Sequence, residues 1–344
     1  MTFGGLDLNT VWFVLVGALF TGYVILDGFD LGVGILHLFV VQRDEERRVF
    51  INAIGPVWDG NEVWLVTGGG ALFAAFPAVY ATVFSGFYIA FMALLCALIF
   101  RAVAIEFRSK HPSRRWRAIW DAGFAGGSVV STLLIGVAMG NIARGIPIDA
   151  RGEFAGSFLG LLNPYALLMG ATTATLFAMH GAMYLVLKTE GDLQATVRRW
   201  VNPLIIAFTL CYVITTLATL LYVPHITEAF RKEPWFFAVA VAVVLAIANI
   251  PREVSHRREF FAFLSSCGAM AGLMAIFGIG MYPNLVFCNL EPAHSLTAVN
   301  AASSQKTLGV MLTIALLGVP AVLAYSASIY WIFRGKVRID RMSY

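Results

Sequence analysis

Charged residues are scarce in this sequence. Only 13% of its 344 residues are charged and 59% are apolar, and the mean hydropathy is +0.78. Soluble domains have about 25% charged residues, so this composition predicts a membrane protein. The net charge of +4 is small, and Lys and Arg lie in short loops rather than on one face. This distribution implies no nucleic-acid partner.

The sequence also lacks the motifs of hydrolases, nucleotide-binding proteins and zinc sites. It has no Walker A motif, no HExxH and no nucleophile elbow, and its four cysteines have no C-x-x-C or Cys/His spacing. We therefore expect no metal site and no catalytic residue in this chain. The N-terminus has neither a positive region nor a small-residue cleavage site, so the first apolar run is expected to be a retained span.

Long apolar runs dominate what remains. A helix needs about 20 apolar residues to cross a bilayer, and the sequence offers nine such runs. They are 10–41, 51–76, 78–107, 117–141, 161–187, 201–223, 234–250, 259–281 and 307–334. No linker, soluble domain or internal repeat interrupts them. The prediction is an all-α polytopic membrane protein with nine spans and a single transmembrane domain, 1–344.

The distribution of Lys and Arg predicts the orientation. Basic residues cluster after the first, third, fifth and seventh runs and after the last, whereas the intervening loops hold few. Because short basic loops stay in the cytoplasm, the N-terminus is expected outside and the C-terminus in the cytoplasm.

Four carboxylates lie inside the first two apolar runs: Asp27, Asp30, Asp59 and Glu62. The members of each pair are three residues apart, so each pair shares a helix face. Helical rise places all four about 10–20 Å from the cytoplasmic ends of their spans, at a depth similar to that of Arg101 in the third run. Acids at this depth are costly unless they face a polar interior, so they indicate a proton path. The alternative is structural ion pairing with Arg101, which is less suited to four acids and one arginine.

Other polar and aromatic residues accompany the acids. Asn61 and Trp58 are candidate wall residues of the path, although interfacial or packing roles are more typical of tryptophan. His180 lies at a comparable depth in the fifth run. Glu106 and Asp121 lie near the cytoplasmic ends of their spans, where the simplest interpretation is that they reach water.

Histidines suited to haem ligation are few. Haem in a helical bundle takes axial His or Met ligands, and only His37 and His180 fall within the apolar runs. A single buried histidine is more often hydrogen-bonded than ligating. We therefore expect the isolated chain to be unable to perform redox chemistry.

A series of longer motifs extends over nearly the whole chain. They are DGFDLGVG at 27–34, GPVWDGNEVWL at 55–65, GGALFAAFP at 69–77, FSGFY at 84–88, FRAVAIEFR at 100–108, LNPYALL at 162–168, HGA at 180–182, NAASSQKTL at 300–308 and YWIFRGKV at 330–337. Together and in this order they resemble subunit II of the cytochrome bd quinol oxidases. The region 188–260 matches least well.

The resemblance implies a nine-helix subunit, built as two four-helix bundles plus a peripheral helix, in the bacterial cytoplasmic membrane. It implies a partner, subunit I, that carries two b-type haems, one d-type haem and the quinol-oxidising loop. The pair reduces O2 to water. It also implies a proton-entry path from the cytoplasm that uses Asp27, Asp30 and Asp59, whereas some relatives have Gln in place of Glu62.

Three features stay open at this point. Some members hold a structural quinone, for which this sequence has no clear signature. Small single-helix subunits accompany some pairs. A different class of function, an ion-coupled transporter, would use the same acids, but it is expected to show inverted repeats and broken helices in both halves. Gly55–Pro56 suits one such break, and the second half offers no matching segment.

Overall fold

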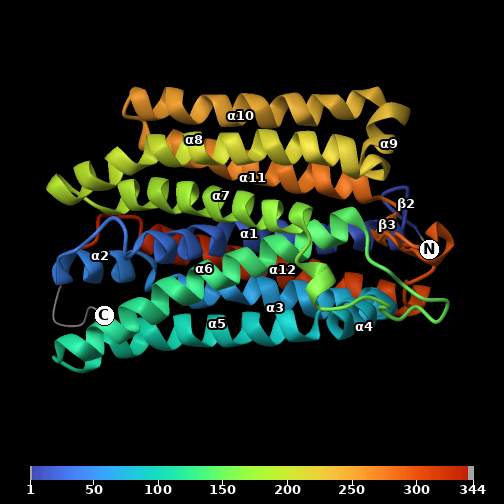
Figure 1. The fold of residues 1–344 in the computed structure, drawn as a ribbon, viewed down its shortest axis with the longest axis horizontal. Coiled ribbons are helices and arrows are strands. Elements are labelled where there is room, and N and C mark those ends of the chain that lie inside the picture. Colours follow the sequence, from blue (N-terminus) through green and yellow to red (C-terminus); the bar gives the residue numbers. More distant parts are fainter. Residues whose placement is uncertain (1, 340–344) are drawn as a thin grey trace.

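The computed structural model describes residues 2–339, which fold almost entirely into helices (Figure 1). The helices are α1 (Leu8–Leu36), α2 (Asp44–Ile54), α3 (Trp58–Ala75), α4 (Pro77–Gly86), α5 (Tyr88–Phe107), α6 (Arg114–Arg144), α7 (Pro164–Lys188), α8 (Gly191–Tyr222), α9 (Pro224–Lys232), α10 (Phe237–Ser255), α11 (Glu259–Met281) and α12 (Gln305–Ile332). Two short antiparallel pairs, β1 (Thr2–Phe3) with β2 (Leu6–Asp7) and β3 (Asn284–Val286) with β4 (Leu296–Thr297), lie at the end where α1 begins.

Eight helices among the described residues are long and apolar enough to cross a membrane. They are α1, α5, α6, α7, α8, α10 with the turn before it, α11 and α12. The α3 helix, 18 residues long, is not among them, because it carries Asp59, Glu62 and three consecutive glycines. Figure 1 nevertheless shows it lying alongside the long helices. The all-helical membrane prediction is therefore confirmed.

Two predicted runs are broken rather than continuous. The run 51–76 is interrupted between Ile54 and Trp58, where Pro56 has no backbone N–H to continue the α2 ladder. The run 78–107 is interrupted at Phe87, between α4 and α5. Apolar composition does not reveal the break at Phe87, since the run is apolar on both sides of it, whereas Gly55–Pro56 marks the first break in the sequence.

Local sequence signals fix several helix starts. The Asp7 side chain accepts a hydrogen bond from the backbone N–H of Thr10 at the start of α1. Asn163 caps α7 in the same way, with Pro164 at its first position, and Ser304 caps α12. These side chains satisfy backbone donors that the first turn leaves unpaired.

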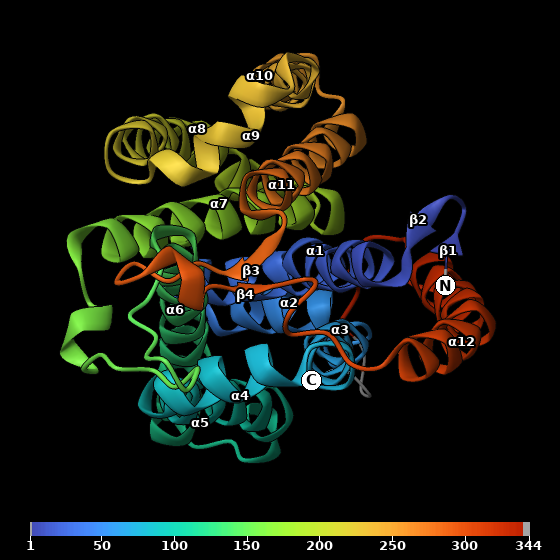
Figure 2. The same ribbon diagram turned by 90° about the vertical axis from the view of Figure 1, so that its right-hand side faces the viewer.

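The α1 helix lies at the centre of the molecule, in contact with α3, α6, α7, α11 and α12 (Figure 2). Glycine permits this packing where α1 crosses α7: a Cβ atom on Gly32 would lie 1.9 Å from the carbonyl oxygen of Phe177. The pair Gly136 and Gly140 similarly admits α7 against α6. Small residues of this kind let membrane helices approach closely, so side chains at the mid-depth of α1 are enclosed by neighbouring helices.

Candidate functional site

Arg101 is the centre of a buried ion cluster that joins α1, α3 and α5. Its Nη2 donates to Asp27 Oδ1 at 2.7 Å, and its Nη1 donates to Glu62 Oε1 at 3.0 Å. Arg101 and Asp27 are fully buried, whereas the Glu62 side chain is 21% exposed. The predicted convergence of acids around this arginine is therefore present for Asp27 and Glu62.

Asp30 extends the cluster along α1 toward α12. Its Oδ2 accepts a hydrogen bond from Asn61 Nδ2 at 2.7 Å, and Asn61 Oδ1 accepts one from the Tyr330 hydroxyl at 2.7 Å. Asp30 is fully buried and Asn61 nearly so. Asn61 therefore does not merely line the path. It donates a hydrogen bond to Asp30 on α1 and accepts one from Tyr330 on α12, so it connects these two helices.

Asp59 does not join this buried cluster. It lies near the start of α3 and is exposed on the surface of the chain, with Trp58 half-buried beside it. Three of the four acids singled out in the sequence therefore come together inside the bundle, and the fourth lies one helical turn from Glu62 on an open face.

His180, on α7, connects its own helix to α1 and α11 through hydrogen bonds. Its Nε2 lies 3.0 Å from the carbonyl oxygen of Ile25 on α1, and its Nδ1 lies 2.7 Å from Ser266 Oγ on α11. The ring also stacks on Phe263 at 4.7 Å. Because both ring nitrogens already have partners, His180 does not fit the role of a haem ligand.

Several buried polar atoms of the cluster have no hydrogen-bond partner among the described residues. They are Tyr23 Oη, Asp27 Oδ2, Asp30 Oδ1 and Arg101 Nε. Buried polar atoms are nearly always paired with protein or with ordered water. The cluster therefore has unused donors and acceptors of the kind that bound water requires.

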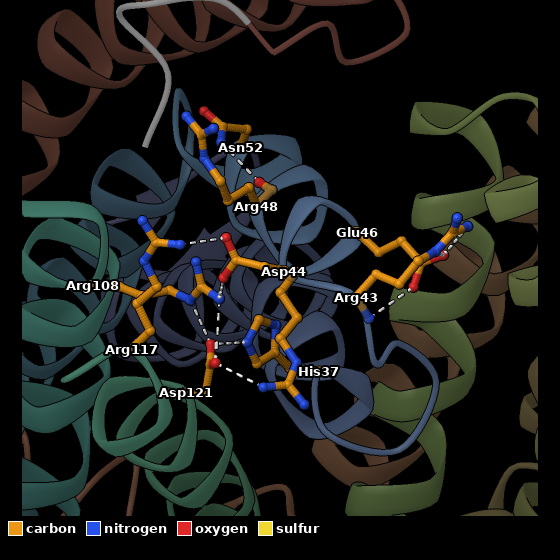
Figure 3. A network of polar contacts seen from close by, with 10 residues as sticks. His37, Arg43, Asp44, Glu46, Arg48, Asn52, Arg108, Arg117 and Asp121 are labelled. Carbon is orange, nitrogen blue, oxygen red and sulfur yellow. Dashed lines mark hydrogen bonds and ion pairs between the residues drawn. The ribbon is translucent and has the colours of Figure 1, made fainter. Parts of the chain in front are cut away.

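A second polar network lies at the α2 end of the molecule, and sequence reasoning missed it. We call it the α2-end network; its members are His37, Asp44, Arg47, Arg108, Arg117 and Asp121 (Figure 3). Asp121 was expected to reach water, but it is 1% exposed, so that interpretation was wrong.

Asp121 is the acceptor at the centre of the α2-end network. It accepts from Arg108 Nε at 2.5 Å and from Arg47 Nη1 at 2.8 Å, and it lies 2.6 Å from His37 Nε2. Asp44, on the more exposed side, pairs with Arg108 at 2.7 Å. The clustering of arginines in the loops around this acid was the one signal that could have revealed the network.

The described residues contain no group of three or more His, Cys, Asp or Glu side chains placed to hold a metal ion. The second buried histidine, His37, is engaged with Asp121 and has Phe124 edge-on at 5.0 Å. Both ring nitrogens of His180 have partners, and His37 Nε2 is engaged with Asp121; no step through a haem is derived for this chain.

Comparison with known proteins identifies the family. The profile of cytochrome bd terminal oxidase subunit II matches residues 8–333. The chain belongs to this family. It is 37% identical to the cytochrome bd-I ubiquinol oxidase subunit 2 of Escherichia coli K12, covering 96% of this chain and 95% of that one. It is 36% identical to the cytochrome bd ubiquinol oxidase subunit 2 of Bacillus subtilis 168, covering 96% and 97%.

A solved structure has the same fold. The bd oxidase of Geobacillus thermodenitrificans aligns with a TM-score of 0.78 at 15% identity, over 95% of this chain and 98% of that one. As a member of the subunit II family, this chain is a multi-pass protein of the bacterial cytoplasmic membrane and a subunit of an oxidoreductase complex. The family predicted from the sequence motifs is confirmed.

Proposed function

We propose that this chain is the haem-free subunit of a quinol:O2 oxidoreductase, and that it stabilises a haem-bearing subunit I and supplies protons for the reduction of O2 to water. Two b-type haems and one d-type haem would reside in subunit I. The single observation that carries the proton role is the buried cluster of Asp27, Asp30, Glu62 and Arg101, which has more carboxyl groups than counter-charges.

The excess of carboxyl groups over positive charges means that some carboxyl groups of this cluster carry protons. One guanidinium faces three carboxyl groups, and a buried carboxylate without a counter-charge is strongly disfavoured. Arg101 compensates one negative charge, so the others are most readily balanced by protons. Moving a proton from one carboxyl to the next changes no net charge, which is what a relay through a low-dielectric interior requires.

Water would complete the relay. The unpartnered atoms of Tyr23, Asp27, Asp30 and Arg101 lie within the same cluster, and bridging water would satisfy them. The partly exposed Glu62 forms the side of the cluster nearest the surface, and the exposed Asp59 lies one turn from it on α3. We propose that protons leave this chain there, toward subunit I.

The proposed topology has nine spans, with α3 as the additional one, the N-terminus outside and the C-terminus in the cytoplasm. Support comes from α12, which runs parallel to α1: Trp12 bonds the carbonyl oxygen of Leu308 at the start of both helices, and Tyr330 bonds Asn61 near the end of α12. An odd number of crossings accounts for two parallel terminal helices. The same proposal includes the arrangement as two four-helix bundles plus a peripheral helix in one domain.

Mutation of the acids tests the proton role in the complete oxidase. Asp27→Asn and Asp59→Asn are expected to lower quinol-dependent O2 consumption while leaving the haem absorption spectrum in place. Glu228→Gln is the matched control, because Glu228 is 62% exposed and forms its ion pair with Lys232 on the same helix, away from the buried cluster. Normal turnover in both aspartate variants would contradict the relay.

An ion-coupled transporter built on the same acids is not favoured, because membership of the subunit II family accounts for the motifs that carry them. Purification separates the two proposals. The oxidase subunit is expected to co-purify with a haem-bearing chain, and quinol oxidation is expected to follow the pair. A transporter would purify alone and move its substrate in liposomes. Mass spectrometry of the same preparation would identify any bound quinone or small single-helix subunit.

A further inference from the structure

A polar stripe runs along α1 from the buried cluster to the α2-end network. Tyr23, Asp27, Asp30 and His37 are spaced four, three and seven residues apart, which places them on one face of the helix. Each is at most 2% exposed. His37 follows directly after the last residue of α1 with helical backbone angles, so it lies about 10 Å along the axis from Asp30.

Gly34 lies midway between Asp30 and His37 on this stripe. Ser128 of α6 occupies the space that a side chain at position 34 would fill. A Cβ atom on Gly34 would lie 1.9 Å from Ser128 Oγ. Ser131 lies three residues farther along α6, fully buried, with its hydroxyl lacking a partner among the described residues. The Ser128 hydroxyl therefore lies in the seam between α1 and α6 where the stripe itself has no side chain, and Ser131, three residues away, shares that side of α6.

His37 lies at the end of this seam nearest α2, and one of its ring nitrogens has no partner among the described residues. Asp121 accepts hydrogen bonds from Arg47 and Arg108, which hold it as a carboxylate. His37 Nε2 must then carry the proton that it shares with Asp121, and Nδ1 is left as an acceptor. That Nδ1 atom is buried and has no partner among residues 2–339.

The surroundings of His37 suit a proton carrier rather than a fixed charge. Asp121 and Arg117 face it from α6, Asp44 and Arg47 from α2, and Arg108 from the turn after α5. Three arginines against two aspartates leave the network with an excess positive charge, so a second proton on the imidazole is held only briefly. The network also reaches the surface, since the Asp44 side chain is 42% exposed and that of Arg117 33% exposed.

We propose that His37 is the cytoplasmic entrance of the proton path in this subunit. Its Nδ1 takes a proton from water that enters beside the α2-end network and passes it, through water beside Ser128 and Ser131, to Asp30. The ring then returns to the neutral form with its proton on Nε2. This inference rests on the proposed proton role of the acids, and it adds the entrance that the acids by themselves lack.

Proton uptake by the two-subunit oxidase in liposomes tests the proposal. The fully reduced complex is mixed with O2, and uptake is followed with a pH-sensitive dye while haem oxidation is followed by absorbance. His37→Gln retains a donor for Asp121 and removes the titrating nitrogen. A positioned acid–base group contributes about 10²- to 10⁴-fold to proton transfer; since water can partly substitute, uptake is expected to slow by about tenfold.

Ser131→Ala is the second variant, and it separates the relay from a structural role. The Ser131 hydroxyl has no partner within residues 2–339, so a purely structural serine predicts no change, whereas the relay predicts uptake slowed several-fold. His225→Gln is the matched control, because the ring of His225 bonds to the carbonyl oxygen of Ala143, away from this seam. Haem content and the rate of haem oxidation by O2 are expected to match the parent enzyme in all three variants.

The outcomes distinguish this inference from the function on which it rests. Parental uptake in His37→Gln and Ser131→Ala, together with slow uptake in Asp27→Asn, would place the entrance elsewhere and leave the proposed function standing. Parental uptake in Asp27→Asn as well would overturn both. If His37→Gln fails to assemble, Ser131→Ala alone decides the question.

Discussion

Removing the Arg101 guanidinium is the sharpest test of the buried ion cluster. In Arg101→Met, an apolar side chain of similar length replaces a fully buried cation, which leaves Asp27 and Glu62 without their shared partner. Breaking a buried ion pair by deleting one member costs about 3–5 kcal/mol. The structure favours the upper half of this range, because Arg101 donates hydrogen bonds to two carboxyl groups rather than one.

The reverse deletion is expected to cost less. In Asp27→Asn, Arg101 keeps its bond to Glu62 at 3.0 Å and loses one charge-assisted hydrogen bond, which corresponds to about 1.5–3 kcal/mol. The double variant Asp27→Asn with Arg101→Met removes both charges. It is expected to be more stable than the sum of the single effects predicts, by about 0.5–3 kcal/mol, as for other residues in direct contact.

Denaturant titration of the purified complex in detergent measures these differences. The two single variants should differ by about 1–3.5 kcal/mol, and about 1.4 kcal/mol already corresponds to a tenfold difference in the unfolding equilibrium constant. Arg101 is not the counter-charge of these carboxyl groups if Arg101→Met is no more destabilising than Asp27→Asn, or if the two effects are additive. Either result would mean that solvent, rather than Arg101, compensates the carboxylates.

Two further predictions concern packing and a loop. Gly32→Ala is expected to destabilise the protein by about 1–3 kcal/mol, because the new Cβ meets the carbonyl oxygen of Phe177 at 1.9 Å; Gly17→Ala, with no atom within 4 Å, is the control in the same denaturant titration. Backbone hydrogen bonds from Glu153 and Arg151 lower the pKa of Asp149. Because the folded-state pKa of Asp149 is below the ordinary value of 3.8, the carboxylate stabilises the loop above that pH, and this stability is lost as the pH falls through the folded-state pKa. The backbone amides of this loop should therefore lose their protection from hydrogen exchange in acid. In Asp149→Ala they should lose it already at neutral pH.

Sequence was sufficient for the membrane class, the approximate helix positions and the family. Apolar run length is a local property that the bilayer thickness turns into helices, and the motifs around Asp27 and Asp59 carry the family resemblance. The i, i+3 spacing also correctly predicted that Asp27 and Asp30 share a face. Gly55–Pro56 marked a possible break before Trp58, whereas the break at Phe87 had no signal, because the apolar character continues through it.

Only the tertiary structure decided which acids meet. Asp27 and Asp59 look alike in the sequence, each at the start of an acidic pair in an apolar run, yet one is fully buried against Arg101 and the other is exposed. Asp121 was expected in water and is enclosed by arginines from two other segments. Spacing fixes the helix face on which a side chain lies. The partner of that face depends on how closely the helices pack, and this packing depends on contacts such as that of Gly32 with Phe177, which join residues far apart in the chain.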